Sequence, residues 1–317
     1  YLQKADGLYN ASGQLTEPTK LRQLVDALGA ALIQGEHYKN PVGIYLNRDW
    51  RYLAVIMASL RSGVVWVPLS REWPKSWTKH IVEKSQIDLI LGEDGDEPSD
   101  HFPLVPLDDF LTMFDTGSEY ESPELFPERC AYIRFTSGST GQPKGAIISR
   151  RSLENHLRWI DEYFSVTSDD RLLFVSQLTF DLTILDIGLL ILKHPDFLFS
   201  NFEGDIFKLI VDIESNAVTT IVGAPTLFNL LLQDGIADRW NTKLLKNIIV
   251  AGSRFPYGLY QSMSSYLRHA MVDNSYGPTE ATNLVSTKRL SWHEKEDIQD
   301  RNVSVGSAVP NMSLSIL

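Results

Sequence analysis

Residues 136–145 read Thr136-Ser137-Gly138-Ser139-Thr140-Gly141-Gln142-Pro143-Lys144-Gly145 and directly follow an apolar strand candidate at 132–135. The glycines let the backbone approach an anion closely and adopt positive φ angles. The hydroxyls and main-chain N–H groups are hydrogen-bond donors, and Lys144 adds a positive charge. This composition suits a triphosphate. An accidental surface loop is the alternative interpretation.

The stretch differs from the P-loop pattern G-x-x-x-x-G-K-[ST]. The spacing from Gly141 to Lys144 does not fit that pattern, and Gly145 stands where the P-loop has Ser or Thr. We therefore expect a phosphate loop of another kind.

Helical and strand-like segments alternate on both sides of this loop. Apolar positions recur with helical period over 21–32, and a short apolar run follows at 42–46. Such alternation indicates βα units and a mainly parallel sheet, with ligands beyond the carboxyl ends of the strands. Further helices are expected at 50–61, 77–84, 151–164, 205–215 and 225–233, and further strands at 64–67, 87–91, 172–175, 218–222, 247–250 and 283–287.

Residues 92–128 are rich in Gly, Pro, Asp, Glu and Ser and show few regular periods. We interpret them as loops and connectors between two lobes. The predicted fold class is α/β, with two doubly wound lobes. Residues 1–128 would form the first αβ lobe and its connectors, and residues 129–317 the phosphate loop and the second αβ lobe. Packing of the N-terminal helix on the second lobe is left open.

The composition excludes several classes of protein. Lys and Arg number 29 against 40 Asp and Glu, so the net charge is −11 and the basic footprint of a nucleic-acid binder is lacking. The single cysteine, Cys130, cannot form an intrachain disulfide and suits a reducing compartment. No signal peptide is visible at 1–7, and the longest apolar run, 182–192, is too short to span a bilayer. We expect a cytoplasmic protein without a membrane span.

Several segments together resemble the adenylate-forming superfamily, which includes acyl- and aryl-CoA ligases, luciferases and the adenylation domains of nonribosomal peptide synthetases. TSGSTGQPKG at 136–145 resembles its signature phosphate loop, and NSYGPTE at 274–280 resembles its N-x-Y-G-P-T-E motif. Further segments match in order: VPL at 67–69 (with Ser70 for the usual Asp), FDLT at 180–183, AGS at 251–253, VG at 305–306 and PN at 310–311. The resemblance covers nearly the whole chain and implies two flavodoxin-like lobes, the N-terminal core of that fold.

The resemblance implies that the chain activates a carboxylic acid with ATP, forming an acyl-adenylate and pyrophosphate. In the family, the residue matched by Tyr276 packs on adenine, Thr279 faces the α-phosphate, and Glu280 is the metal ligand, a hard oxygen donor that suits Mg²⁺. Catalytic roles would fall to Lys144, Thr279 and Glu280. The residues implied in nucleotide binding are Thr136, Ser137, Gly138, Ser139, Thr140, Gly141, Lys144, Gly252, Ser253, Asn274, Ser275, Tyr276, Gly277 and Thr279. Taken alone, 276–280 also fits a surface turn.

Asp181 bears on the choice of substrate. A carboxylate among apolar neighbours is either a helix N-cap or the partner of a buried cation. In the peptide-synthetase branch the matching aspartate pairs with the substrate α-ammonium, so Asp181 favours an amino acid. The resemblance implies an acid site of Phe180, Asp181, Leu182, Leu185, Val222, Ile249, Ala251, Ser275, Asn283 and Leu284. This mostly aliphatic set has no second charge and favours a small or medium neutral amino acid, although its aliphatic members also fit plain core positions.

An amino-acid substrate favours the phosphopantetheine thiol of an acyl or peptidyl carrier protein as the acceptor. The expected cofactors are therefore ATP, Mg²⁺ and phosphopantetheine, and no nucleic-acid partner is expected. An acyl- or aryl-CoA ligase is the first alternative, and an inactive interaction module of the same fold is the second. The seven histidines, His156 among them, lack the spacing of a metal pair and are interpreted as surface or core residues.

Complete family members continue beyond the segment matched by Pro310-Asn311. They add an aspartate for the ribose hydroxyls, a hinge and a small C-terminal subdomain with a catalytic lysine, which no lysine of this chain matches. We therefore interpret the chain as the large N-terminal core without its C-terminal adenylation subdomain, and we expect adenylation by this portion alone to be strongly impaired.

Overall fold

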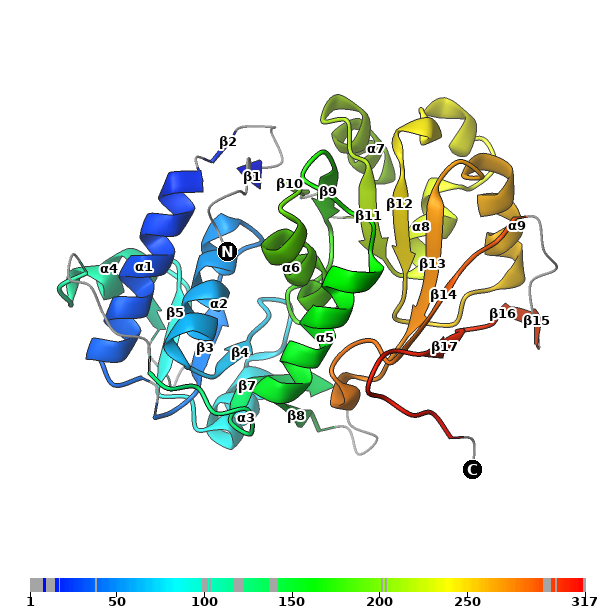
Figure 1. Cartoon of the computed structure of the whole chain (residues 1–317). Helices are drawn as coiled ribbons and strands as arrows, with labels where there is room; N and C mark the ends of the chain where they lie inside the picture. The colour runs from blue at the N-terminus through cyan, green and yellow to red at the C-terminus, as the bar shows by residue number, and fades with distance from the viewer. Residues whose placement is uncertain are drawn as a thin grey trace. The chain divides into compact units, whose positions relative to one another are not determined.

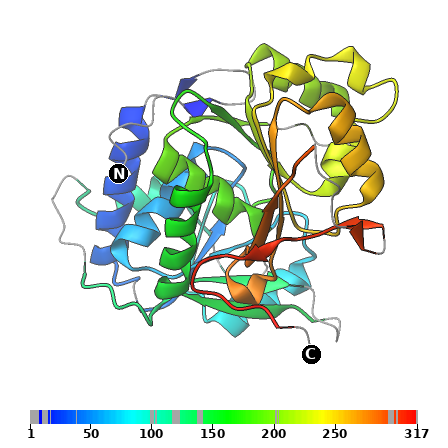
Figure 2. The same ribbon diagram turned by 45° about the vertical axis from the view of Figure 1, so that its right-hand side comes forward.

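The chain divides into two compact units in the computed structural model. The N-terminal unit comprises Glu17–Glu154, and the C-terminal unit comprises Asn155–Leu317 together with Tyr1–Thr16. Each unit is built on a sheet of its own (Figures 1 and 2). The structure describes residues 8–9, 15–16, 18–37, 39–98, 102, 104–116, 123–136, 142–200, 202, 204–292, 298–299 and 301–315.

The sheet of the N-terminal unit has the strand order β6-β5-β3-β4-β7-β8. Neighbouring strands run parallel, apart from the antiparallel pair β7–β8. The strands are β3 (Val42–Tyr45), β4 (Trp66–Pro68), β5 (Leu89–Gly92), β6 (Leu104–Pro106), β7 (Cys130–Thr136) and β8 (Lys144–Ser149). The helices are α1 (Pro18–Gln34), α2 (Trp50–Ser62), α3 (Lys75–Ser85) and α4 (Leu107–Thr112). Apolar side chains of α3 pack with those of β4 and β5 in one cluster.

The sheet of the C-terminal unit has the order β17-β14-β13-β12-β11-β9-β10-β1-β2 and is parallel from β13 to β1. Its strands are β1 (Leu8–Tyr9), β2 (Leu15–Thr16), β9 (Arg171–Phe174), β10 (Asp196–Phe199), β11 (Thr220–Gly223), β12 (Asn247–Val250), β13 (Met271–Tyr276), β14 (Ser286–Arg289) and β17 (Ser307–Ala308). A hairpin of β15 (Ile298–Gln299) and β16 (Asn302–Val303) stands apart. The helices are α6 (Leu182–Lys193), α7 (Ile206–Ser215), α8 (Pro225–Leu231) and α9 (Tyr257–Tyr266), with 3-10 turns η2 (Ala237–Arg239), η3 (Thr242–Leu244) and η4 (Thr279–Ala281). Helix α5 (Arg150–Tyr163) begins in the N-terminal unit and belongs to the C-terminal unit from Asn155 onward.

Side-chain alternation divides the C-terminal sheet into two faces. Ile221 of β11 and Ile248 of β12 belong to an apolar core shared with α7, α8 and α9. The neighbouring positions Val222, Ile249 and Asp273 are register partners and therefore point to the opposite face. Helices α5 and α6 cover that opposite face (Figures 1 and 2).

The expected α/β class with mainly parallel sheets is confirmed. The division between the units falls at Glu154, whereas the sequence suggested residue 128. The reason is strand pairing: β7 joins β4 through the register Trp66↔Tyr132, which adds β7 and β8 to the N-terminal sheet. Helix α1 packs against α2 in the same unit.

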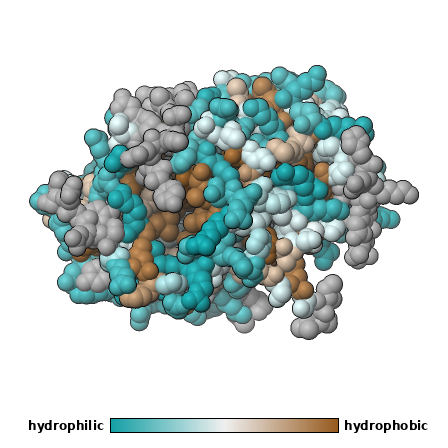
Figure 3. All heavy atoms as spheres, in the orientation of Figure 1, coloured by the Kyte–Doolittle hydropathy of each residue, from teal (hydrophilic) through white to brown (hydrophobic). Residues whose placement is uncertain are grey.

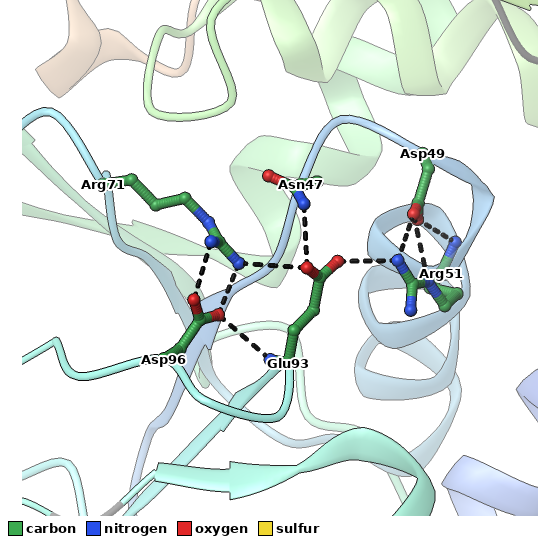
Figure 4. A network of polar contacts seen from close by, with 6 residues as sticks. All are labelled: Asn47, Asp49, Arg51, Arg71, Glu93 and Asp96. Atoms are coloured by element: carbon green, nitrogen blue, oxygen red, sulfur yellow. Dashed lines mark hydrogen bonds and ion pairs between the residues drawn. The ribbon is translucent and has the colours of Figure 1, made fainter.

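A network of charged side chains connects the carboxyl ends of β3, β4 and β5 in the N-terminal unit (Figure 4). Its members are Asn47, Asp49, Arg51, Arg71, Glu93 and Asp96. Glu93 accepts a hydrogen bond from Arg51 Nη2 at 2.6 Å and lies 3.4 Å from Arg71 Nη2. Each arginine also binds one of the two aspartates. Glu93 is therefore the shared carboxylate between two half-buried guanidinium groups.

Hydrophilic residues predominate on the face in Figure 3, with apolar residues in separate groups among them. Exposed apolar side chains include Phe207 and Val211 on α7. Such scattered residues are ordinary on protein surfaces and do not indicate a binding site by themselves. Over the described ranges, no helix combines the length and the apolar character needed to cross a bilayer.

Replacement of Glu93 by Gln should lower the free energy of unfolding by about 1–2 kcal/mol, because it removes the carboxylate shared by two guanidinium groups. Urea unfolding measures this change. Glu97→Gln is the matched control, since Glu97 is 81% exposed and lies 3.6 Å from Lys75. The control should stay within about 0.5 kcal/mol of wild type. Equal losses in both variants would contradict the assigned role of Glu93.

Candidate functional site

Helix α6 carries the first part of the predicted acid site. Asp181 stands at its N-cap position, is 9% exposed, and has helical φ and ψ angles of −59° and −30°. Its side chain makes no capping hydrogen bond, which argues against the N-cap interpretation. Leu182 and Leu185 follow and are buried. The carboxylate therefore stands at the buried start of an apolar helix.

The carboxyl-terminal halves of β11, β12 and β13 carry the second part of the predicted acid site. Val222 and Ile249 point to the sheet face that α5 and α6 cover. Ser275 lies on the same face, two residues after Asp273. Ala251 extends the ladder past β12, with its N–H donating to the Gly223 carbonyl at 3.0 Å. All four predicted site residues are buried, as is Leu284.

A cavity of about 360 Å³ lies at the carboxyl ends of β9 and β11. It is lined by Val175, Ser176, Gln177, Phe180, Leu182, Phe202, Val222, Gly223, Ala224, Thr226 and Leu227. The described lining is uncharged and mostly apolar, and the volume falls in the range of small-molecule sites. Three predicted acid-site residues, Phe180, Leu182 and Val222, therefore meet around one cavity. The described lining does not include Asp181, Leu185, Ile249, Ala251, Ser275, Asn283 or Leu284.

Gly252 lets the loop after β12 pass close to Phe180. Its φ angle is +92°, and a Cβ atom there would lie 2.7 Å from Cζ of Phe180. Glycine adopts this conformation without strain and leaves room for the ring. The adjacent Ser253 is exposed. The backbone of Gly252 therefore lies next to the ring of Phe180, a residue that is itself 39% exposed.

Strand β13 carries the predicted adenine motif. Its last residue, Tyr276, is 49% exposed and offers a ring face for stacking on a base. Asn274 is buried, and its Nδ2 donates to the carbonyl oxygens of Val303 and Ser304 at 3.3 and 2.9 Å. The Asn274 amide therefore supports the end of the strand, and Tyr276 is the aromatic residue that a ligand could reach.

Gly277 folds the motif back on itself. A Cβ atom at Gly277 would lie 1.7 Å from the carbonyl oxygen of Asn283. The Val285 N–H donates to the Tyr276 carbonyl at 2.8 Å and closes the loop. A glycine is required here by close approach of two backbone segments, and this approach brings the ends of residues 276–285 together.

The folded-back loop contains Thr279 and Glu280 in the turn η4. Glu280 is exposed, and one carboxylate together with phosphate oxygens fits the ligand preference of Mg²⁺. The next residues, Thr282 and Asn283, have left-handed φ angles of 68° and 73°. Such strained backbone costs about 1–3 kcal/mol per residue and clusters at functional sites. Over the described ranges, no group of three or more His, Cys, Asp or Glu is arranged for a metal ion.

The predicted phosphate loop connects β7 and β8 in the N-terminal unit. Thr136 and Lys144 are register partners at the loop end of this antiparallel pair. Lys144 is exposed. Ser137, Gly138, Ser139, Thr140 and Gly141 lie outside the described residues. The loop is therefore anchored between two paired strands, unlike a P-loop, in which a helix follows.

Sequence patterns did not identify His156 as a neighbour of the site. This fully buried residue of α5 has Nε2 at 3.3 Å from Nδ2 of Asn283. Burial lowers the pKa of His156 to about 4, so the ring is neutral at pH 7. Ser176 and Thr226 in the cavity lining were not predicted either. These residues stand on separate elements, and no sequence spacing connects them.

Residues 19–317 match the model of the AMP-binding enzyme family, and the chain belongs to that family. PksN, a polyketide synthase of Bacillus subtilis, is 29% identical over 303 residues, which cover 90% of this chain. Tyrocidine synthase 3 of Brevibacillus parabrevis is 28% identical over 282 residues, 87% of this chain. The N-terminal subdomain of Klebsiella oxytoca NpsA, solved with 3-hydroxybenzoyl-AMSN, has a TM-score of 0.79 at 20% identity over 96% of this chain and 76% of that one.

These comparisons confirm the resemblance to the adenylate-forming superfamily and its nonribosomal-peptide-synthetase adenylation domains. The NpsA subdomain shares the fold, which is that of the N-terminal core. The chain spans only 5% of PksN and 4% of tyrocidine synthase 3. The chain therefore matches a small part of these large proteins.

Replacement of Gly277 by Ala should lower the free energy of unfolding by at least about 2 kcal/mol, because the added methyl group would collide with the Asn283 carbonyl. Urea unfolding of the protein measures the loss. Gly258→Ala is the control: a Cβ atom there meets nothing within 4 Å, so the substitution in α9 should be neutral or stabilising. A Gly277→Ala variant as stable as Gly258→Ala would refute the close approach.

Proposed function

We propose that the chain is the nucleotide- and acid-binding core of an enzyme that activates a small or medium neutral amino acid as an aminoacyl-adenylate. The observation that carries this proposal is the cavity beside the start of α6. Phe180 and Leu182 line the cavity, and Asp181 lies between them in sequence. An uncharged, mostly apolar lining suits a neutral side chain, because a charged one would lose its hydration without gaining a partner.

Asp181 would pair with the α-ammonium of the amino acid. In the peptide-synthetase adenylation domains that the chain resembles, the matching aspartate pairs with the substrate α-ammonium. A simple fatty or aryl acid has no such group. This argument favours an amino-acid-activating enzyme over the alternative of an acyl- or aryl-CoA ligase.

The nucleotide-binding roles are assigned to the residues that the family motifs predicted. Tyr276 would stack on adenine, since its ring is exposed at the end of β13. Gly252 and Ser253 would border the nucleotide from the loop after β12, and Thr279 would contact the α-phosphate. Glu280 would hold Mg²⁺, which neutralises phosphate charge when bound. In the N-terminal unit, residues 136–144, Lys144 included, would bind the β- and γ-phosphates.

The reaction joins a substrate carboxylate oxygen to the α-phosphorus of ATP. The bond from the α-phosphorus to the bridging oxygen breaks, and pyrophosphate leaves with the electron pair. Negative charge therefore grows on the bridging oxygen, so N–H donors and Lys144 near the phosphates would stabilise the transition state. Positioning of the two reactants supplies much of the remaining acceleration.

We further propose that the aminoacyl group passes to the phosphopantetheine thiol of a carrier protein. The thiolate would attack the acyl carbon, and AMP would leave. The similarity to tyrocidine synthase 3 supports this acceptor over coenzyme A.

The second alternative, an inactive module of this fold, is disfavoured because Lys144, Thr279 and Glu280 are all present. Calorimetric titration with ATP and Mg²⁺ distinguishes an active enzyme from an inactive module, since an inactive module should give no binding heat.

The proposal is tested by ATP–pyrophosphate exchange with the full-length protein across the proteinogenic amino acids and a set of simple aryl and fatty acids. We expect exchange with one or a few small or medium neutral amino acids. Exchange with simple acids alone would establish the CoA-ligase alternative instead.

Replacement of Asp181 by Ala should reduce kcat/KM for the amino acid at least about 100-fold, because the α-ammonium loses a desolvated charge partner. The same pyrophosphate-exchange assay measures it, and KM for ATP should stay near wild type. Asp170→Ala is the control, since Asp170 is also a buried carboxylate but lies at the amino end of β9. Undiminished exchange by Asp181→Ala would rule out the pairing.

Replacement of Lys144 by Ala should weaken ATP binding about tenfold, because an exposed charge near the phosphates is lost. Calorimetry measures the affinity. The melting temperature should hardly change, since the backbone pairing of β7 with β8 remains. Lys79→Ala on α3 is the matched control, because it removes one lysine whose side chain is 41% exposed. A large stability loss with unaltered ATP affinity would indicate a structural role for Lys144.

A further inference from the structure

Asn283 has an unusual local structure for a residue proposed to contact a substrate. It is buried, and both it and Thr282 have left-handed φ angles. The close approach of Gly277 to its carbonyl oxygen holds its backbone in place. Because the backbone is held, the direction of the Asn283 amide depends on what its side chain contacts.

That contact is His156 on α5. The distance between Nδ2 of Asn283 and Nε2 of His156 is 3.3 Å. Nδ1 of His156 is buried and has no hydrogen-bond partner among the described residues. The neutral ring has one donor and one acceptor nitrogen, and its hydrogen bond within the described part of the chain goes to Asn283. A fully buried imidazole is thus directed at one side chain of the predicted acid site.

An aromatic face of α5 restricts the imidazole. Trp159 and Tyr163 follow His156 at i+3 and i+7, on the same side of the helix. The ring centroids of His156 and Trp159 lie 5.5 Å apart, as do those of Trp159 and Tyr163. Tyr163 Oη donates to Asp273 Oδ1 at 2.8 Å, and Arg289 Nε donates to the same oxygen at 3.1 Å. These contacts tie α5 to β13 and fix the helix that carries His156.

Helix α5 also contacts the strand that carries a second predicted site residue, Ser275. Asp273 is two residues before Ser275 on β13, and Ser275 Oγ lies 2.8 Å from Thr287 Oγ1 on β14. Helix α5 therefore contacts the strand that carries Ser275 through Tyr163, and it contacts the Asn283 side chain through His156. Both contacts come from the helix that covers this face of the sheet.

We propose that His156 is a positioning residue, which fixes the side-chain amide of Asn283 and so helps to set which amino acid the pocket accepts. This inference rests on the proposed function and on the family resemblance, which implies that Asn283 belongs to the acid site although it is not among the described residues that line the cavity. Removal of the imidazole would leave the Asn283 amide free to turn, and amino-acid recognition would change while nucleotide binding would not.

The test compares three variants of the full-length protein in ATP–pyrophosphate exchange. His156→Leu should lower kcat/KM for the preferred amino acid about tenfold, the equivalent of one buried hydrogen bond, while KM for ATP stays within about twofold. His156→Gln should recover most of that loss, because the Gln amide reaches the position of Nε2. Thr220→Val is the control: it breaks a buried asparagine hydrogen bond of 3.2 Å at the amino ends of β11 and β12 and should leave selectivity unchanged.

Nitrogen-15 NMR of the histidine side chains gives a readout independent of activity. At pH 7, His156 should show a neutral ring whose tautomer balance shifts in Asn283→Ala. The inference is overturned if His156→Leu weakens ATP and amino acid alike, or behaves like Thr220→Val. A wild-type protein that activates no amino acid would instead overturn the proposed function, and the selectivity role of His156 with it. The change of His156 tautomer balance in Asn283→Ala would then indicate a structural contact alone.

Discussion

The close approach between Gly277 and the Asn283 carbonyl is the constraint on which the candidate site depends. It turns a linear run of residues into a loop, with Tyr276 at its entrance and Thr279 and Glu280 within it. The strain of the left-handed pair that ends at Asn283 is tolerated because paired strands hold both ends of the loop. One glycine thus couples the proposed adenine contact to the proposed substrate contact.

The parallel sheet supplies the other half of the arrangement. The carboxyl ends of β9, β11, β12 and β13 lie in one row, and side-chain alternation turns Val222 and Ile249 to the face of α5 and α6. Helix α6 begins at that row with Asp181, and the cavity opens there. The position of the proposed pocket follows from strand order and register. Its uncharged lining is the basis of the proposed preference for a neutral substrate.

Sequence patterns predicted the longer elements well, because α1, α2 and α5 each run for several turns with a regular apolar period. They missed β6 and α4 within 92–128, since three and six residues are too few to show a period. The unit boundary was missed because strand pairing of β7 is a long-range property. Motifs point to Asp181 and Tyr276, whose roles are proposals, whereas His156 and Ser176 carry no local signal and lie near predicted site residues through packing alone.

The most direct test is a crystal structure of the protein with a hydrolysis-resistant aminoacyl-adenylate analogue. We predict the adenine against the ring of Tyr276, the α-ammonium within hydrogen-bond distance of Asp181, and the side chain in the cavity between Phe180 and Val222. An analogue bound elsewhere, with the Tyr276 ring and this cavity both vacant, would contradict the account.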